Sequence, residues 1–422
     1  MLYQATEQSL LSYQPGDPAA ILLPEAAFGA LKIYALRDDA EPILRYFVQR
    51  GREYLRVGPY VGFLQATTSV ALEILPKITS ELTPDAVRVA RAALLRMLLA
   101  VPDLFPRPLP ESQFSQISHF PMPEMLAALF LKRAEKLLHR GLQTDYRTVD
   151  TEMPFVKGKL RLSQNPFALA LHPERLPVAY DERTRNNPPN RLLKACLQRL
   201  RLGKFARPVR QHLFAMEEIP DTTNWREDLA QARRHDRTFR AYTWLWPWAE
   251  WLLGGHAPGL ADDKNRLPGL LFATQRLFES YVATSLKRYL PAEFQVSIQE
   301  SAYHLLFDFA GKATHRLRPD VVVRRGNAVW ILDTKWKLIA GSSSHISHLS
   351  QSDLYQLYAY GQRYLNEEGR VKLGLIYPQT PEFMKVPRPH QYEPHLPLYL
   401  LPADLSVSAP QMVAKLWEGL GE

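Results

Sequence analysis

A single cysteine, Cys196, is present among the 422 residues. One cysteine excludes an internal disulfide framework and a cysteine-based metal cluster, so we expect Cys196 to be a small core residue. No apolar run reaches the roughly 18 residues of a membrane span, and the N-terminus has neither the basic nor the apolar region of a secretory signal. We therefore expect a cytoplasmic protein that does not enter a membrane.

The sequence also lacks a phosphate-binding loop of the form Gly-x-x-x-x-Gly-Lys-Ser/Thr. Gly311 and Lys312 match part of it, but Leu306 stands where the first glycine would be and Ala313 where the hydroxyl would be. The chain is therefore not expected to hydrolyse a nucleoside triphosphate by itself. Internal repeats and low-complexity tracts are absent as well.

The composition is that of a globular protein, with 46% hydrophobic and 23% charged residues. A chain of 422 residues is long enough for two or three domains, each with its own core. The net charge of +9 and the pI of about 9.4 favour a polyanionic partner without requiring one.

Patterning divides the chain into three parts. Residues 1–120 mix short strand-like runs with helix, and a proline-rich connector is expected over residues 102–123. Residues 121–240 are mainly helical, and residues 241–422 carry the charged motifs described below. The turn-rich residues 254–259 mark the clearest break between the last two parts.

Outside the C-terminal part, apolar periodicity predicts helices over residues 84–100, 122–142 and 192–206, with Asn190 as the N-cap of the third. The helix over residues 122–142 is amphipathic. Its polar face carries five basic residues: Lys132, Arg133, Lys136, His139 and Arg140. A solvated face and a surface for a partner subunit or DNA both explain this pattern.

The most informative stretch is residues 317–337, LRPDVVVRRGNAVWILDTKWK. It predicts two apolar strands joined by a tight Gly-Asn turn. Asp320 opens the first strand, and Asp333 and Lys335 close the second. Side chains on a strand alternate between its two faces, so Asp333 and Lys335 point the same way. The hairpin returns Asp320 to a place beside them.

Two carboxylates and one ammonium that converge in this way suit a metal-dependent phosphodiesterase. Carboxylate oxygens suit Mg²⁺, which keeps several of its waters, and Mn²⁺ accepts similar ligands. A lysine beside such an ion can orient or deprotonate an attacking water. The alternative interpretation of the same residues is a surface salt bridge beside a β-turn.

The elements expected around this hairpin favour the catalytic interpretation. Helix 276–289 and strand 294–301 precede it, and helix 353–360 and strand 371–377 follow it. The order of helix, three strands, helix and strand resembles the common core of the PD-(D/E)xK nuclease superfamily. That resemblance implies a restriction-endonuclease-like domain, in which a mixed sheet is flanked by helices.

Two further residues gain roles from this resemblance. Gln356 and Tyr360 lie one helical turn apart and share a face, which resembles the Gln-x-x-x-Tyr motif beside the active site of RecB-type nucleases. Glu279, on the first helix, matches a superfamily glutamate that supports the metal. The alternatives are tyrosines packed in the core and a solvated glutamate.

Two other groups have less specific patterns. Trp244, Trp246, Trp248 and Trp251 could stack on bases, but a cluster that packs one helix against its neighbours is the more common arrangement. His345 and His348 have a metal-ligand spacing, yet they lie in a serine-rich segment typical of a surface loop.

Several separate stretches together resemble the McrC family, the nuclease subunits of McrBC modification-dependent restriction systems. They cover most of the chain in the family's order: residues 57–64 (VGPYVGFL), 72–78 (LEILPKI), 94–98, 141–146, 157–160, 190–194, 332–337 and 353–356. The resemblance implies a multidomain α+β or α/β fold. Its parts are an N-terminal mixed α/β domain that binds an AAA+ partner (1–120), a helical middle region (121–240) and a nuclease domain (241–422).

The resemblance also implies an endonuclease that cuts double-stranded, methylated DNA with Mg²⁺ or Mn²⁺. Asp320 and Asp333 would hold the metal with the Thr334 carbonyl, and Glu279 would be an auxiliary ligand. Lys335 would position or activate the water, and Gln356 would support the site or contact DNA. Catalytic roles are thus expected for Asp320, Asp333, Lys335, Glu279 and Gln356.

The implied partner is a hexamer of a McrB-like AAA+ GTPase, which the N-terminal half would insert into or cap and stimulate. The missing phosphate-binding loop agrees with a separate motor subunit. Two alternatives stay open: a stand-alone RecB-like repair nuclease or exonuclease, and a non-catalytic DNA-binding activator scaffold.

Overall fold

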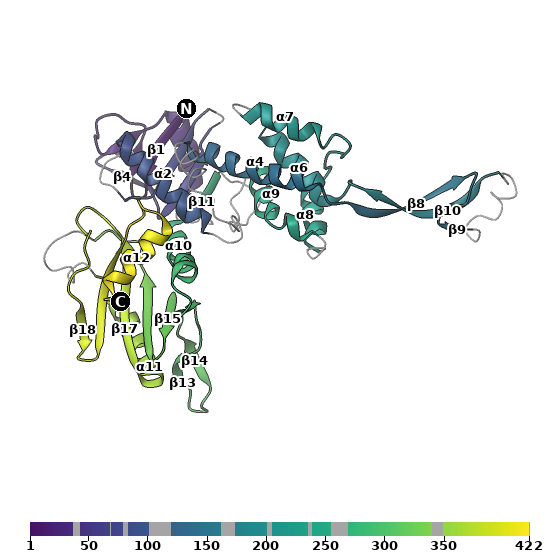
Figure 1. Cartoon of the computed structure of the whole chain (residues 1–422). Helices are drawn as coiled ribbons and strands as arrows, with labels where there is room; N and C mark the ends of the chain where they lie inside the picture. Colours follow the sequence, from purple (N-terminus) through teal and green to yellow (C-terminus); the bar gives the residue numbers. More distant parts are fainter. Residues whose placement is uncertain are drawn as a thin grey trace. The chain divides into compact units, whose positions relative to one another are not determined.

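The computed structural model describes residues 1–36, 43–67, 69–78, 83–100, 120–161, 174–200, 205–234, 239–254, 269–339 and 349–421 (Figure 1). The chain forms two compact units, one of Met1–Met125 with Gly259–Glu422 and one of Leu126–Pro258. The mixed α/β, multidomain fold class expected from the sequence is confirmed. The three-part division stays a prediction, and the structure groups the first and last parts in one unit. No helix of the described ranges is both long enough and apolar enough to cross a membrane.

Two four-stranded sheets form the N-terminal part of the first unit, with the orders β1-β7-β6-β11 and β3-β2-β5-β4. Their strands are β1 (Leu2–Thr6), β2 (Leu10–Ser12), β3 (Ala20–Leu22), β4 (Leu44–Gln49), β5 (Arg52–Val57), β6 (Tyr60–Gln65), β7 (Ala71–Leu75) and β11 (Gly269–Ala273). Helix α1 (Glu25–Ala35) shares one core with both sheets, because Leu11, Phe28 and Ile74 belong to the same buried cluster.

Strand β11 explains why the two ends of the chain form one unit. It precedes the C-terminal module in the sequence, yet it pairs antiparallel with β6 of the N-terminal sheet. The backbones approach so closely that a Cβ on Gly62 would lie 2.0 Å from the carbonyl oxygen of Leu270. Gly62 also has a φ of +141°, which side chains disfavour. The VGPYVGFL stretch therefore needs a glycine at this position.

Helix α2 (Pro84–Leu99) confirms the helix expected over residues 84–100. Thr83 caps it, and its side chain accepts a hydrogen bond from the Ala86 amide at 3.3 Å. Glu73 of β7 is fully buried and accepts hydrogen bonds from Arg91 on α2 and from the Met122 amide. The LEILPKI stretch thus supplies the carboxylate that joins β7 to the segments that follow it.

A six-stranded mixed sheet of order β12-β15-β16-β17-β19-β18 forms the C-terminal part of the same unit. Its strands are β12 (Gln295–Ile298), β15 (Val321–Arg325), β16 (Ala328–Thr334), β17 (Arg370–Pro378), β18 (His390–Glu393) and β19 (Leu396–Ala403). Strand β17 is parallel to both β16 and β19, and the other pairs are antiparallel.

Helices cover both faces of this sheet: α10 (Thr274–Tyr289), α11 (Gln351–Glu368) and α12 (Ala409–Gly419). On β16, Ile331 lies in the core that contains Leu357 of α11. The next residue back, Trp330, packs instead against Trp417 of α12, with ring centroids 5.2 Å apart. Because neighbouring residues on a strand face opposite ways, α11 and α12 lie on opposite faces.

The expected order of helix, three strands, helix and strand is present, with one addition. A separate hairpin of β13 (His304–Phe307) and β14 (Ala313–Arg316) stands between β12 and β15. The Gly-Asn turn of the β15–β16 hairpin is confirmed, since Gly326 has a positive φ of 57° between the two strands.

The second unit combines helices with a small sheet. The helices are α4 (Met122–Arg140), α6 (Pro188–Arg199), α7 (Ala206–Phe214), α8 (Trp225–Arg234), a 3-10 turn η2 (Arg240–Tyr242) and α9 (Leu245–Gly254). The strands are β8 (Asp145–Met153), β9 (Lys159–Leu160) and β10 (Leu176–Thr184), in the order β8-β10-β9. This sheet was not expected from the sequence, which predicted a helical middle region.

The N-cap expected at Asn190 is wrong. Helix α6 begins at Pro188, and its N-cap is Asn187, whose side chain accepts a hydrogen bond from the Asn190 amide at 3.1 Å. Proline at the first helical position has a suitable φ and no amide to satisfy. Asn190 is instead fully buried, and its side-chain oxygen accepts a hydrogen bond from the Tyr242 hydroxyl at 2.6 Å.

The tryptophan cluster packs in the interior of the second unit. All four indoles are at most 9% exposed: Trp244, Trp246, Trp248 and Trp251. Phe130 of α4 contacts two of them, with centroids 5.6 Å from Trp244 and 5.4 Å from Trp248. Cys196 is fully buried as expected, and burial raises the pKa of its thiol above the ordinary value. The four indoles are too deeply buried to stack on a base.

Candidate active site

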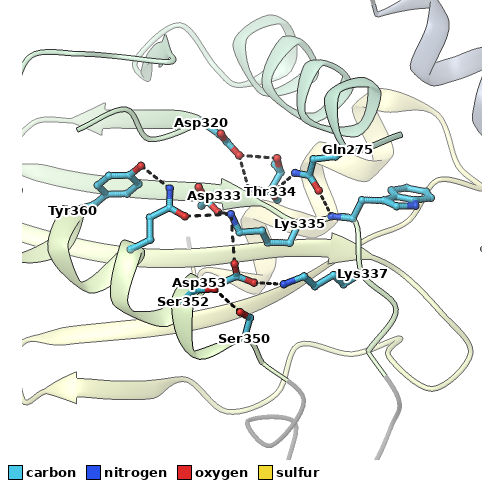
Figure 2. A network of polar contacts seen from close by, with 12 residues as sticks. Gln275, Asp320, Asp333, Thr334, Lys335, Lys337, Ser350, Ser352, Asp353 and Tyr360 are labelled. Atoms are coloured by element: carbon cyan, nitrogen blue, oxygen red, sulfur yellow. Dashed lines mark hydrogen bonds and ion pairs between the residues drawn. The ribbon is translucent and has the colours of Figure 1, made fainter. Parts of the chain in front are cut away.

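The β15–β16 hairpin brings Asp320 and Asp333 together. Asp320 directly precedes β15 and Asp333 is the penultimate residue of β16. Because Val321 pairs with Leu332, the two aspartates are neighbours across the antiparallel ladder. Asp333 is only 3% exposed. Figure 2 shows both side chains beside the end of β16.

Lys335 lies against Asp333, as the alternation of side chains predicts. Its Nζ is 2.7 Å from Asp333 Oδ2 and 3.9 Å from Asp353 Oδ1. It also donates a hydrogen bond of 3.4 Å to the side-chain oxygen of Gln356. The ammonium group is therefore surrounded by oxygen atoms from the strand and from α11.

The electrostatics of the site reflect crowded negative charge. Burial, followed by repulsion from Asp320, raises the pKa of Asp333 to about 6, although Lys335 opposes the shift. Burial works against the charged form of Lys335, but Asp333 outweighs it, so the pKa of Lys335 lies above its ordinary value. Burial, and then the charge of Asp320, also raises the pKa of Glu279. A cation bound among these groups would relieve the repulsion.

One oxygen of Asp320 is already engaged. Asp320 Oδ2 accepts hydrogen bonds from the Thr334 amide and the Thr334 hydroxyl, both at 2.7 Å. These bonds fix the carboxylate against the end of β16. The Thr334 carbonyl, which we expected to be a metal ligand, accepts a hydrogen bond of 2.7 Å from Gln275 on α10.

The residues fit a hard divalent cation such as Mg²⁺ or Mn²⁺. The part of the chain that the structure describes contains no group of three or more His, Cys, Asp or Glu side chains arranged to hold a metal ion. Mg²⁺ does not require such a group, because one or two carboxylates, waters and substrate phosphates complete its shell. The two adjacent aspartates supply that smaller set of oxygen ligands.

Gln356 and Tyr360 occupy the positions expected from their spacing on α11. The side-chain amide of Gln356 donates to the Tyr360 hydroxyl at 2.8 Å, and that hydroxyl donates to the Arg318 carbonyl at 3.2 Å. This chain of bonds turns the carbonyl oxygen of Gln356 toward Lys335. Tyr360 is 5% exposed and belongs to the core, whereas Tyr355 is 64% exposed.

Glu279 lies at the edge of the site. Its carboxylate accepts a hydrogen bond of 2.5 Å from the side chain of Gln299, which follows β12. The Gln299 amide in turn donates to the Asp320 carbonyl at 2.9 Å. The structure therefore connects Glu279 to Asp320 through Gln299. An auxiliary role at the metal stays a prediction.

Three residues of this network were not assigned roles from the sequence: Gln275, Asp353 and Lys337. Asp353, in the first turn of α11, forms an ion pair of 2.6 Å with Lys337. An acidic residue in the first turn of a helix was the available signal. Gln275 had no such signal, because its partners are backbone atoms of another element. His345 and His348 lie outside the described residues.

Comparisons with known proteins agree with this fold. The family model described as McrBC 5-methylcytosine restriction system component matches residues 55–378. A structure of Thermococcus gammatolerans McrB AAA+ hexamers with bound McrC, refined as a half-complex from a tetradecameric assembly, matches with a TM-score of 0.69. It is 18% identical, with 100% of both chains covered. A cryo-EM structure of the Thermococcus gammatolerans McrBC complex matches with a TM-score of 0.50 and 19% identity, over 69% of this chain and 88% of the other. A comparison with curated proteins finds no match.

At these identities the two structural matches show a shared fold. The family model is more specific, and it spans the β6–β7 region, the β15–β16 hairpin and all of α11 and β17. The family resemblance expected from the sequence is thereby confirmed. The chain belongs to the family of McrBC 5-methylcytosine restriction system components.

Proposed function

We propose that this protein is a McrC-like endonuclease subunit that hydrolyses DNA phosphodiester bonds with Mg²⁺ or Mn²⁺. The observation that carries the proposal is the meeting of Asp320, Asp333 and Lys335 at the end of the β15–β16 hairpin, with a 2.7 Å contact between the last two. Asp320 and Asp333 would hold the metal. When bound, the metal acts as a Lewis acid and makes its water more acidic.

Lys335 has an electrostatic role in this scheme. Because Asp333 keeps the pKa of Lys335 above its ordinary value, the ammonium stays protonated at neutral pH. A protonated lysine cannot remove a proton from water, but it can orient the attacking water and stabilise charge that develops on the phosphate. Gln356 would hold the ammonium in place through its side-chain oxygen.

The partner in this proposal is a hexamer of a McrB-like AAA+ GTPase. One of the T. gammatolerans structures contains McrB AAA+ hexamers with bound McrC, and this chain has no phosphate-binding loop of its own. We place the contact within residues 1 to about 150, with help from the basic face of α4. GTP hydrolysis by the partner would be stimulated by the contact and would in turn switch on cleavage.

We propose that the β8–β10 sheet of the second unit is a further contact for the hexamer. Most residues of β8 are exposed, and four large apolar side chains on or near the sheet are at least 43% exposed: Tyr146, Phe155, Val156 and Leu160. A small sheet with little buried surface gains stability from a partner that covers it. Changing Tyr146 and Phe155 to serine is therefore expected to weaken binding to the hexamer without changing the metal site.

The experiment compares the chain alone, the McrB-like GTPase alone and their mixture. Each is given GTP, Mg²⁺ and a linear duplex that contains 5-methylcytosine. We expect cleavage only in the mixture, and none when Asp333→Asn replaces the wild type. Asp404→Asn is a matched control, since Asp404 is a buried carboxylate of the same module, 6% exposed, that binds Lys415 and Ser406.

Other results would favour the alternatives. Degradation of DNA ends by the purified chain without the GTPase would favour a RecB-like nuclease. Full cleavage by Asp333→Asn in the mixture would mean that another protein cuts and that this chain is an activator scaffold. Loss of cleavage in Asp404→Asn to the same degree would show that the assay reports folding and not chemistry.

A further inference from the structure

Glu7 is a buried carboxylate that joins the N-terminal sheet to the catalytic strand, by which we mean β16 with its continuation to Trp336. It follows β1 in a turn and is 4% exposed. Its carboxylate accepts hydrogen bonds from the indole Nε1 of Trp336 at 2.7 and 2.9 Å and from the Lys77 amide at 3.1 Å. Trp336 is the residue directly after Lys335, so one bond leads from the first strand of the chain to the active site.

Gln275 makes a second connection to the same backbone. Its side-chain nitrogen donates to the Thr334 carbonyl at 2.7 Å, and its side-chain oxygen accepts from the Trp336 amide at 2.6 Å. One amide therefore bonds to the backbone on both sides of Lys335, as a neighbouring strand would. The Lys335 amide itself donates to Ile376 of β17 at 2.9 Å.

Both connections start from the N-terminal sheet. Gln275 lies in the first turn of α10, which directly continues β11 of that sheet. The Thr274 amide and hydroxyl at this junction donate to the Pro59 carbonyl at 3.1 and 3.2 Å. Glu7 reaches Trp336 from β1, and β1 and β11 are the two edges of the one sheet. Two routes from separate strands thus converge on the backbone at Lys335.

We propose that Glu7 and Gln275 are positioning residues for Lys335, which hold the catalytic strand to the N-terminal sheet through Trp336 and the Thr334 carbonyl. The inference rests on the proposed nuclease function for the meaning of Lys335. Neither residue touches the reacting atoms. Their effect is to fix the backbone so that the lysine ammonium stays 2.7 Å from Asp333.

Burial of Glu7 indicates a specific role for its carboxylate. Burial raises the pKa of this carboxyl, while the bonds from Lys77 and Trp336 lower it. An apolar residue of similar size would avoid the desolvation and would fill the same volume. It would leave the indole Nε1 of Trp336 and the Lys77 amide without their acceptor, and unsatisfied buried donors destabilise the local structure. A matched set of variants can separate the acceptor from the volume.

The test uses the full chain with Glu7→Gln, Glu7→Leu and Gln275→Leu, and with Asp404→Leu as control. Glutamine keeps a carbonyl oxygen for both donors, and leucine keeps only the volume. The control removes a buried, multiply bonded carboxylate that is away from the catalytic strand. Hydrogen–deuterium exchange of the amides from Thr334 to Lys337 is measured on the chain without metal, DNA or partner. Cleavage is then measured with the McrB-like GTPase, and kcat is separated from KM.

We expect hydrogen–deuterium exchange of the Trp336 amide to become at least about tenfold faster in Glu7→Leu and in Gln275→Leu. Glu7→Leu removes the charged acceptor of the Trp336 indole, and Gln275→Leu removes both bonds of the Gln275 side chain to the backbone. The value of kcat should fall about tenfold or more with KM within about twofold, since misplacement of a reacting group lowers the chemical step. Glu7→Gln should restore both values to near wild type. Asp404→Leu should leave both unchanged in the folded protein.

The exchange measurement is independent of cleavage, so a chain that cuts no DNA would refute the proposed function and leave this inference open to its own test. Wild-type exchange in Glu7→Leu or Gln275→Leu would overturn the inference. Equal damage by Glu7→Gln and Glu7→Leu would also overturn it. If Glu7→Leu does not fold, Trp336→Phe takes its place, because phenylalanine keeps the packing on Phe278 and removes the indole donor. Normal kcat in a folded Trp336→Phe would then overturn the inference, and a tenfold loss would support it.

Discussion

Replacing Asp333 by asparagine is expected to stabilise the metal-free protein at neutral pH while it abolishes cleavage. Asp333 is 3% exposed, and burial together with the charge of Asp320 raises its pKa from 3.8 to about 6. A carboxyl with a raised folded pKa binds its proton more tightly in the folded state. Its ionisation therefore removes stability as the pH rises from about 4 to about 6.

The magnitude follows from this shift. About two pKa units correspond to about 3 kcal/mol above pH 6, and asparagine at position 333 would avoid that destabilisation. The gain is smaller than this limit, because Lys335 would lose the carboxylate 2.7 Å away and be left half-buried with Asp353 and Asp320 as its remaining acidic neighbours. We expect a net gain of about 1 to 2 kcal/mol in the free energy of unfolding at pH 7.5.

Urea unfolding in EDTA at pH 7.5 and at pH 5 measures the effect. The gain should be present at pH 7.5 and fall to about half at pH 5, midway between the ordinary pKa of 3.8 and the folded pKa of about 6. Asp404→Asn is the control, for which the expected change in the free energy of unfolding has the opposite sign. Burial raises the pKa of Asp404, but bonds from Lys415 and Ser406 outweigh burial and lower it overall, so this variant should lose stability at pH 7.5.

Magnesium adds a second comparison. Addition of about 10 mM Mg²⁺ should raise the unfolding midpoint of the wild type, because a ligand that binds the folded state stabilises it. The same addition should have little effect on Asp333→Asn. The reasoning is refuted if Asp333→Asn in EDTA is less stable than the wild type at pH 7.5, because the aspartates would then stabilise the fold without a cation.

Three further predictions concern the site and its support. Lys335→Met should lower kcat about 10²- to 10³-fold, as loss of one charge-stabilising donor does, and leave DNA binding in a gel-shift assay within about twofold. Gly62→Ala should place a methyl group 2.0 Å from a carbonyl oxygen of β11, and a loss of several kcal/mol in urea unfolding is expected. Arg324 binds Glu300 and Glu368 at 2.6 to 2.8 Å, so Arg324→Met should cost about 2 to 3 kcal/mol at pH 7. Since the Arg324 side chain lowers the pKa of both carboxyls, this difference should shrink as the pH falls below about 4.5 in pH-dependent unfolding.

Local pattern was sufficient to predict the β15–β16 hairpin. The apolar runs on both sides of Gly326 and Asn327 have the lengths of strands, and the turn requires a residue with positive φ. Alternation along the second strand then places Asp333 and Lys335 on one side. Helical spacing likewise predicted that Gln356 and Tyr360 would contact each other. Both predictions depend on residues that are close in the sequence, within one hairpin or one turn of a helix.

Local pattern was not sufficient for the β8–β10 sheet or for the cap of α6. No side chain of β8 is fully buried, and the alternation of half-buried and exposed side chains is limited to residues 149–153, so the apolar alternation that would predict a strand is weak. Asn187 and Asn190 are both good capping residues. The choice between them depends on the buried acceptors and donors around Asn190, among them Tyr242, which is distant in the sequence.

The sequence by itself determined the β15–β16 hairpin with its charged residues, the helices that flank it and the family, because each depends on residue types at fixed spacing. Only the tertiary structure decided that β11 completes the N-terminal sheet and that Glu7 and Gln275 bond to the backbone around Lys335. Those bonds join residues separated by between 59 and 329 positions. Several of their donors and acceptors are backbone atoms. Every residue type has the same backbone carbonyl, so the sequence does not indicate which one will accept such a bond. The folded N-terminal sheet brings Glu7 and Gln275 to this backbone, and no periodicity in the sequence around either residue predicts the contact.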